Sequence, residues 1–205
     1  MGDAYGHFID SVLPFLSLTM QPIILASQSP RRKQLLEWAE IPFEIIVKQT
    51  DEHYPFGLKP EEIAVYIARN KALAIKNEVP ANKVILAADT IVVLGESIIG
   101  KPVHREEAVS ILLALSGQKH QVITGVVLLR GQDEIAFADR TEVEFHELTE
   151  EQIEFYVDKY KPYDKAGAYA IQEWIGVVGI KSVSGDFYNV MGLPVSRVVR
   201  ALNKF

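Results

Sequence analysis

The chain has 205 residues, of which 48% are hydrophobic and 23% charged, and its formal net charge at pH 7 is −6. A chain of this length can bury a sizeable core, as one domain or two tightly joined lobes, and this composition excludes a disordered or low-complexity protein. The negative charge argues against a protein that wraps nucleic acid. The absence of cysteine excludes disulfides and thiolate metal sites, and suits a reducing cytosol.

The first nineteen residues contain the apolar stretch FIDSVLPFLSL. They resemble a secretory signal only faintly, because Asp3 and Asp10 are acidic and there are no leading cations and no small-residue cleavage site. We expect an extension over residues 1–19 and a single domain over 20–205, with Met20 as an alternative start. No downstream stretch is long and apolar enough to span a membrane, so we expect a soluble, cytoplasmic protein without a membrane partner.

The first half of the chain reads as two strands and two helices. An apolar run predicts a strand over 22–26, and Pro30 opens a helical pattern with Ser29 as its N-cap. A second strand is expected over 43–47 and a loop over 50–60. From Glu61 a long amphipathic helix follows, with an expected apolar stripe of Ile63, Ile67, Ala68, Ala74 and Ile75.

The second half mixes strands and helices. Residues 84–89 predict a buried strand, 91–100 a hairpin, and 106–117 a helix closed by glycine. A long antiparallel pair turns at Gly131 and Gln132, and Thr149 with Gln152 caps the next helix. A strand and turn over 177–188 and an amphipathic helix over 194–205 complete the chain. The pattern predicts an α/β or mixed α+β fold around a mixed sheet.

The segment LASQSPRRK, residues 25–33, joins the first strand to the first helix. Such a junction offers free backbone N–H groups and a favourable dipole to an anion. Ser27, Ser29, Arg31 and Arg32 add hydroxyl and guanidinium donors suited to phosphate. An ordinary N-cap with solvated cations is an equal alternative. Two arginines in a first turn oppose the helix dipole, however, and a bound phosphate chain would compensate them.

Carboxylates follow two predicted strands. We expect Asp89, with Thr90, at the carboxyl end of its strand, where α/β folds tend to place ligands. Asp51 and Glu52 lie in the loop after another strand, where a solvated acidic pair is the ordinary interpretation. Carboxylates from separate strand ends can share a hard cation such as Mg²⁺. The five histidines are scattered, without an i, i+4 pair for zinc, and we expect each to be structural or at the surface.

Several lysines could contact phosphate. Lys71 lies within a predicted helix, where a solvated position is the default, whereas Lys101 is held by the neighbours Gly100 and Pro102. The segment YDKAGAYAIQ, residues 163–172, contributes Lys165, and the amide of Gln172 could read a base edge; a plain loop is an equal alternative. No Walker A and no GxGxxG pattern occurs, so a nucleotide would be bound in another way.

Seven motifs, taken together and in order, resemble those of the Maf family of nucleoside triphosphate pyrophosphatases. They are LASQSPRRKQLL, ARNKA, AADT, GKP, LSGQKHQVITGV, DKAGAYAIQ and SGDFYNVMGLPVS. The resemblance covers residues 22–205. It implies an α/β fold with a deep central cleft, a homodimer, and hydrolysis of a nucleotide between its α and β phosphates. The segment DKAGAYAIQ resembles that of the subgroup that acts on dTTP and UTP. The resemblance implies a house-cleaning role in nucleotide metabolism, and the physiological substrate could be a canonical or a modified pyrimidine nucleotide.

The resemblance also implies residue roles. Asp89 matches the assigned catalytic acid-base residue, Arg31, Thr90 and Gln172 match positions linked to substrate choice, and Ser27, Arg32, Glu52, Lys71 and Lys101 match other cleft positions. We expect Mg²⁺, or alternatively Mn²⁺, to be held by Glu52 and Asp89, with Lys71 and Lys101 assisting catalysis and Lys165 contacting substrate. Whether Asp89 takes the water's proton or holds the metal stays open. A nucleotide-binding regulator of septum formation without significant turnover is the alternative function.

Overall fold

A computed structural model describes residues 21–205. The extension expected over 1–19 and the alternative start at Met20 lie outside these residues. In the described part, a mixed sheet of seven strands has the order β2-β1-β3-β5-β6-β7, and β4 pairs with β3 beside this path. The expected mixed sheet flanked by helices is therefore confirmed. Within residues 21–205, no helix combines the length and apolarity needed to cross a membrane.

The first half forms a small parallel unit. Strand β1 (Ile23–Leu25) leads into helix α1 (Pro30–Trp38), which Ser29 caps with its side chain as expected. Strand β2 (Phe43–Ile45) and helix α2 (Pro60–Ile75) follow. Strand β1 pairs in parallel with β2 on one side and with the beginning of β3 on the other. The loop between β1 and α1 is therefore held beside β3.

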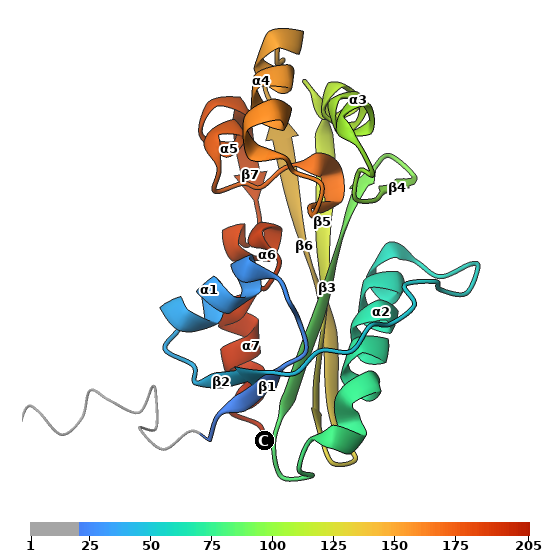
Figure 1. The fold of residues 1–205 in the computed structure, drawn as a ribbon, viewed down its shortest axis with the longest axis vertical. Helices are drawn as coiled ribbons and strands as arrows, with labels where there is room; N and C mark the ends of the chain where they lie inside the picture. Colours follow the sequence, from blue (N-terminus) through green and yellow to red (C-terminus); the bar gives the residue numbers. More distant parts are fainter. Residues whose placement is uncertain (1–20) are drawn as a thin grey trace, which may run out of the picture.

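Long antiparallel strands form the body of the sheet (Figure 1). Strand β3 (Ile85–Leu94) turns into β4 (Ser97–Ile99), and β5 (Lys119–Arg130) pairs with β6 (Asp133–Phe145) along its whole length. Strand β7 (Ile180–Ser184) closes the far edge. The predicted hairpin and the long pair around Gly131 are confirmed.

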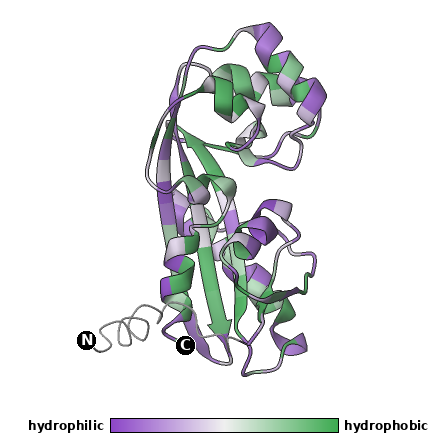
Figure 2. Ribbon diagram, turned by 90° about the vertical axis from the view of Figure 1, so that its left-hand side faces the viewer, coloured by the Kyte–Doolittle hydropathy of each residue, from purple (hydrophilic) through white to green (hydrophobic). Residues whose placement is uncertain are grey.

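Helices cover both faces and one end of this sheet. Helix α2 lies on one face, and α1, α6 (Phe187–Met191) and α7 (Val195–Leu202) lie on the other (Figure 1). Helices α3 (Arg105–Leu115), α4 (Glu150–Tyr160) and α5 (Trp174–Gly179) gather at one end. Two 3₁₀ turns, η1 (Lys76–Glu78) and η2 (Ala166–Ala168), complete the described elements. Figure 2 shows the apolar residues concentrated where helices meet the sheet.

The alternation of side chains along β3 decides where its polar residues point. Ile85 and Ala87 pack in the core cluster under α2, whereas Leu86 and Ala88 pack in the cluster on the opposite face. Successive side chains of a strand point to opposite faces. Asp89 therefore points to the α2 side, and Thr90 points to the side of α1 and α6.

Gly125 brings α2 against the sheet beside Asp89. It pairs directly with Asp89 across the β3–β5 ladder. A Cβ atom at this position would lie 2.2 Å from the backbone carbon of Ala64 on α2. Only glycine allows so close an approach of helix and strand. This packing holds the following turns of α2, and with them Lys71, close to Asp89.

Three predictions need correction. Asp89 lies in the middle of the ten-residue strand β3, because the predicted strand and the first arm of the hairpin are one continuous strand. Asp89 nevertheless lies beyond the end of β1, whose pairing with β3 stops at Leu86. On α2, the buried stripe includes Ala64 and Ala72, whereas Ala74 is only half-buried.

The third correction concerns the strand expected to begin at Val177. Residues Trp174–Gly179 form helix α5, and the strand starts only at Ile180. A short apolar run does not distinguish strand from helix by periodicity. Gly176 lies within this helix, and its missing Cβ leaves room for the carbonyl of Ile171.

Candidate functional site

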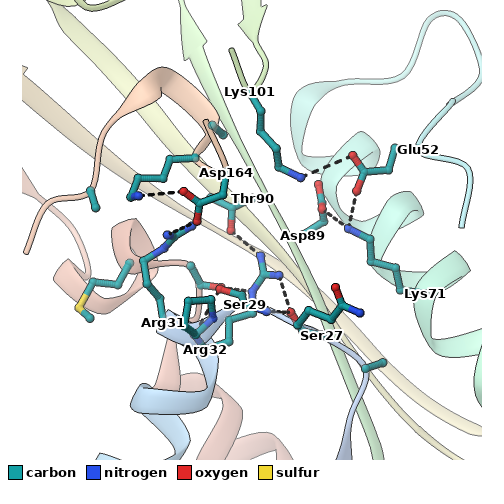
Figure 3. A pocket seen from close by; sticks show the side chains of 18 of the residues that line it. Ser27, Ser29, Arg31, Arg32, Glu52, Lys71, Asp89, Thr90, Lys101 and Asp164 are labelled. Atoms are coloured by element: carbon teal, nitrogen blue, oxygen red, sulfur yellow. Dashed lines mark hydrogen bonds and ion pairs between the residues drawn. The ribbon is translucent and has the colours of Figure 1, made fainter. Parts of the chain in front are cut away.

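A cavity of about 640 Å³ opens between the β1–α1 loop, the loop before α2, and the segment around η2. Figure 3 shows side chains from these segments pointing into it. The structure brings all the predicted site residues except Gln172 to its wall: Ser27, Arg31, Arg32, Glu52, Lys71, Asp89, Thr90, Lys101 and Lys165. Residues that are far apart in the sequence therefore share one cleft, as the sequence predicted.

Lys71 links the two predicted metal-binding carboxylates. Its Nζ lies 2.5 Å from Oδ1 of Asp89 and 2.8 Å from Oε1 of Glu52. Asp89 is 7% exposed, so this ion pair is largely shielded from water. Lys101 comes from the loop after β4, and its Nζ lies 3.8 Å from Oε2 of Glu52. Lys71 therefore lines the cleft, and the solvated position that was the default for a lysine within a helix is wrong.

The charges of this cluster determine the protonation of Glu52. Burial raises the pKa of Glu52, but the hydrogen bond and charge of Lys71, with the charges of Lys101 and Arg32, outweigh it and leave the pKa below its usual value. Glu52 is therefore a carboxylate at neutral pH. A carboxylate is the form that can bind a cation.

Arg32 forms the floor of the cavity on the other side of β3. Its Nε donates to the carbonyl oxygen of Gly192 (2.8 Å), one terminal nitrogen donates to Ser27 Oγ (3.1 Å), and the other donates to Thr90 Oγ1 (2.9 Å). Thr90 in turn shares a 2.9 Å hydrogen bond with Thr124. These contacts fix the guanidinium plane. Ser27 and Thr90 therefore position Arg32, in addition to lining the cavity.

Arg32 is a buried cation without a carboxylate partner. It is 8% exposed, and no Asp or Glu oxygen lies within 4 Å of it among residues 21–205. Burial lowers the pKa of Arg32, with Arg31 acting in the same direction and Asp89 opposing it, yet an arginine stays charged in proteins. Of its five N–H donors, three are used by the contacts above. The others can bind an anion that enters the cavity.

Arg31 faces the cavity from the same helix but is already paired. One of its terminal nitrogens donates to Oδ2 of Asp164 at 3.0 Å. A bound phosphate was expected to compensate the charge of Arg31, but in the structure the carboxylate of Asp164 compensates it. Burial raises the pKa of Asp164, but Lys165 and Arg31 outweigh it and lower the pKa below its usual value.

Lys165 is buried and paired as well. Its Nζ lies 2.8 Å from Asp164 Oδ1 and 3.5 Å from Glu173 Oε1. The predicted substrate contact of Lys165 would therefore require it to leave two carboxylates. Gln172 is exposed and does not line the cavity. The structure thus does not place its amide where the predicted base contact needs it.

No sequence motif indicated the apolar part of the cavity wall. This part, the apolar wall, consists of Val92, Val122, Tyr169, Val190 and Met191. The residues come from β3, β5, the segment after η2, and α6, and only the fold brings them together. Tyr169 lies within the segment YDKAGAYAIQ, but a tyrosine between two alanines does not reveal which cavity it faces.

The carboxylates of Glu52 and Asp89 fit a hard divalent cation whose remaining ligands come from the substrate and water. Glu52 and Asp89 both reach the Lys71 ammonium, and residues 21–205 contain no group of three or more His, Cys, Asp or Glu side chains arranged to hold a metal. Mg²⁺ is commonly bound by one or two carboxylates together with substrate phosphates and water. The site therefore suits a small polyanion at its cationic side chains, and the same cavity also offers an apolar surface.

Comparison with known proteins agrees with this description. The model of the Maf-like protein family matches residues 22–205, so the chain belongs to the Maf family. A dTTP/UTP pyrophosphatase of Cytophaga hutchinsonii is 53% identical over 182 residues, covering 89% of this chain and 83% of that protein. A dTTP/UTP pyrophosphatase of Parabacteroides distasonis is 46% identical, covering 92% and 98%.

A search of solved structures finds more distant similarity. The Ham1 protein of Staphylococcus aureus is 15% identical with a TM-score of 0.41, covering 61% of this chain and 72% of that one.

Proposed function

We propose that this protein hydrolyses dTTP and UTP, and modified pyrimidine nucleotides of the same kind, to the nucleoside monophosphate and pyrophosphate. The observation that carries the proposal is the placement of Arg32, a buried cation with unused donors, across one strand from the Asp89–Lys71–Glu52 cluster. The relatives described above are named for this activity. A triphosphate has the charge and length to reach both groups.

The cations hold the phosphate chain and stabilise the leaving group. Arg32, Lys71 and Lys101 would contact phosphate oxygens, and their positive charge offsets the charge that develops on pyrophosphate as it departs. Arg31 would exchange Asp164 for phosphate at the rim. Because the hydrogen bonds to Ser27, Thr90 and Gly192 fix the Arg32 guanidinium before substrate arrives, it needs little reorganisation.

Asp89 is the proposed base. Its Oδ1 is bonded to Lys71, and the ion pair with Lys71 does not use Oδ2. Water attacks the α-phosphorus, the bond from this phosphorus to the bridging oxygen breaks, and pyrophosphate leaves with that oxygen. The proton of the water passes to Oδ2 of Asp89. Lys71 keeps the carboxylate in place through Oδ1.

Glu52 and Asp89 would hold the divalent cation, with Mg²⁺ as the first choice and Mn²⁺ as the second. When bound, this cation neutralises phosphate charge close to the scissile bond. In the structure, Lys71 provides the positive charge between the two carboxylates. The Lys71 ammonium has three N–H donors, so it can contact a phosphate oxygen while it keeps its bond to Asp89.

Product analysis in ¹⁸O-labelled water tests the proposal. With Mg²⁺ and dTTP, we expect pyrophosphate rather than orthophosphate, and the label in dTMP rather than in pyrophosphate. The same reaction with Asp89→Asn is the control. Tight dTTP binding without turnover would instead favour a regulatory nucleotide-binding protein, and label in pyrophosphate would move the attack to the β-phosphorus.

We further propose that the protein acts as a homodimer in the cytoplasm. Sedimentation of the purified full chain tests the first statement and cell fractionation tests the second. A monomer at working concentration, or recovery outside the cytoplasmic fraction, would contradict them.

A further inference from the structure

The proposed reaction uses the charged residues of the cavity and leaves the apolar wall unused. The apolar wall, which consists of Val92, Val122, Tyr169, Val190 and Met191, lines the same cavity as the cations and carboxylates. A nucleoside triphosphate has the same two-part character, with a charged chain and a flat ring of low polarity. The wall is therefore available for the part of the substrate that the phosphate contacts do not recognise.

Tyr169 is the aromatic member of this wall, and its ring is held on several sides. Its hydroxyl forms a 2.7 Å hydrogen bond with His120 Nε2. The Tyr169 ring packs edge-on against Phe145 and His120, with centroid distances of 5.1 and 5.5 Å, and the His120 ring stacks on Phe145. Tyr169 is only 6% exposed. Its ring therefore has little freedom to move.

The backbone that carries Tyr169 is also fixed. Gly167 in η2 adopts φ +72, and a Cβ there would lie 2.9 Å from Val92 on β3. The N–H of Gly167 donates to the carbonyl of Gly100 at 3.1 Å. The turn is thus pressed onto the strand that carries Asp89. A ring held in this way contacts a planar ligand without losing much conformational freedom on binding.

We propose that Tyr169 seats the nucleobase against the apolar wall, and that His120 is a positioning residue that holds the Tyr169 ring for this purpose. This inference rests on the proposed function, because it assigns the base of the same substrate. It also gives the base contact to Tyr169 in place of Gln172, which is exposed and outside the cavity. His120 does not line the cavity and acts only through Tyr169.

Inorganic tripolyphosphate distinguishes the phosphate contacts from the base contact, because it offers the phosphate chain without a base. We would measure the KM for dTTP and the inhibition constant of tripolyphosphate for each variant. Tyr169→Leu should raise the KM for dTTP by roughly 5- to 100-fold, the loss expected when an aromatic partner of a base is truncated, and leave tripolyphosphate inhibition unchanged. Arg32→Lys should weaken both.

Further variants isolate the ring and its support. Tyr169→Phe keeps the ring but loses its hydrogen bond to His120, so it should raise the KM for dTTP less than Tyr169→Leu and about as much as His120→Phe. His120→Phe removes the hydrogen bond that holds the ring and should raise the KM for dTTP more than it lowers kcat, again without changing tripolyphosphate inhibition. Tyr160→Leu makes the same exchange as Tyr169→Leu in a half-buried tyrosine that packs on this core but does not line the cavity. It should leave both constants unchanged.

Two outcomes would overturn the inference. If Tyr169→Leu weakens dTTP and tripolyphosphate equally, Tyr169 has only a structural role. If Tyr169→Leu changes neither constant and Gln172→Ala raises the KM for dTTP, the base is read by Gln172. Failure of the proposed function is separate, because the unaltered protein would then release no pyrophosphate from dTTP.

Discussion

The ammonium of Lys71 on α2 lies 2.5 Å from Oδ1 of Asp89 on β3. This contact joins the helix that covers one face of the sheet to the middle of a central strand. It holds the proposed base by one oxygen and leaves the other for the attacking water. The contact exists because Gly125 allows α2 to touch the sheet, so the chemistry of the site depends on the packing next to it.

Replacing Asp89 by Asn should reduce kcat for dTTP by about 10²–10⁴-fold, the usual contribution of a general base. The amide keeps the size of the side chain but has no carboxylate oxygen to accept a proton. Steady-state pyrophosphate release measures the effect, and tripolyphosphate binding checks that the site is intact. Unchanged turnover in this variant would remove Asp89 from the mechanism.

Metal removal should abolish activity, and added Mg²⁺ should restore it. Glu52→Gln should raise the Mg²⁺ concentration for half-maximal activity by at least about 10-fold, since even the outer partners of metal ligands contribute this much. Glu44→Gln is the matched control, because Glu44 pairs with Lys83 away from the cavity. An equal Mg²⁺ requirement in Glu52→Gln and the unaltered protein would contradict the assignment.

Gly125→Ala should destabilise the protein by about 1–3 kcal/mol or more, because an added methyl group overpacks a filled core. It should also lower kcat, since the displaced helix moves Lys71 away from Asp89. Urea unfolding and dTTP turnover measure the two effects. A Cβ at Gly100 would meet nothing within 4 Å, so Gly100→Ala should leave the free energy of unfolding nearly unchanged. Full stability in Gly125→Ala would disprove the close contact.

His120 makes stability depend on pH. Burial lowers the pKa of His120 to about 4 from an ordinary value of 6.5. Between these values the unfolded chain binds a proton that the folded protein does not, so stability is lost as the pH falls from 6.5 towards 4. The loss from this group is up to about 3 kcal/mol.

Urea unfolding at several pH values measures this loss. His120→Gln should flatten part of the decline below pH 6.5, because the group that titrates is gone. His53→Gln, in the exposed loop before α2, should not flatten it. An identical pH profile for His120→Gln and the unaltered protein would show that His120 takes up its proton equally in both states.

Features set by neighbouring residues could be predicted from the sequence. The Ser29 cap of α1 and the Thr149–Gln152 capping box of α4 are local, and both were found. The full extent of β3 was not predicted, because nothing in its own sequence shows that Asp89 and Thr90 continue the strand. The pairing of Arg31 with Asp164 joins residues 133 positions apart and depends on tertiary packing alone.

The cluster of site residues was predicted largely from ordered motifs that resemble the Maf family. Their roles toward one another came only from the structure. Arg32 could not be recognised as buried from its place in a first helical turn, where a cation is ordinarily solvated. Gln172 was assigned to the base by its amide alone, and the fold leaves it outside the cavity.

Asp89 and Thr90 are neighbours in the chain, yet they project from opposite surfaces of one strand. A single residue inserted or deleted between Ile85 and Asp89 would reverse the whole outer part of this strand. The carboxylate would then face Arg32 and neutralise the guanidinium reserved for phosphate, while the threonine would face Lys71 and offer no base. These few residues of β3 should therefore tolerate no change in length.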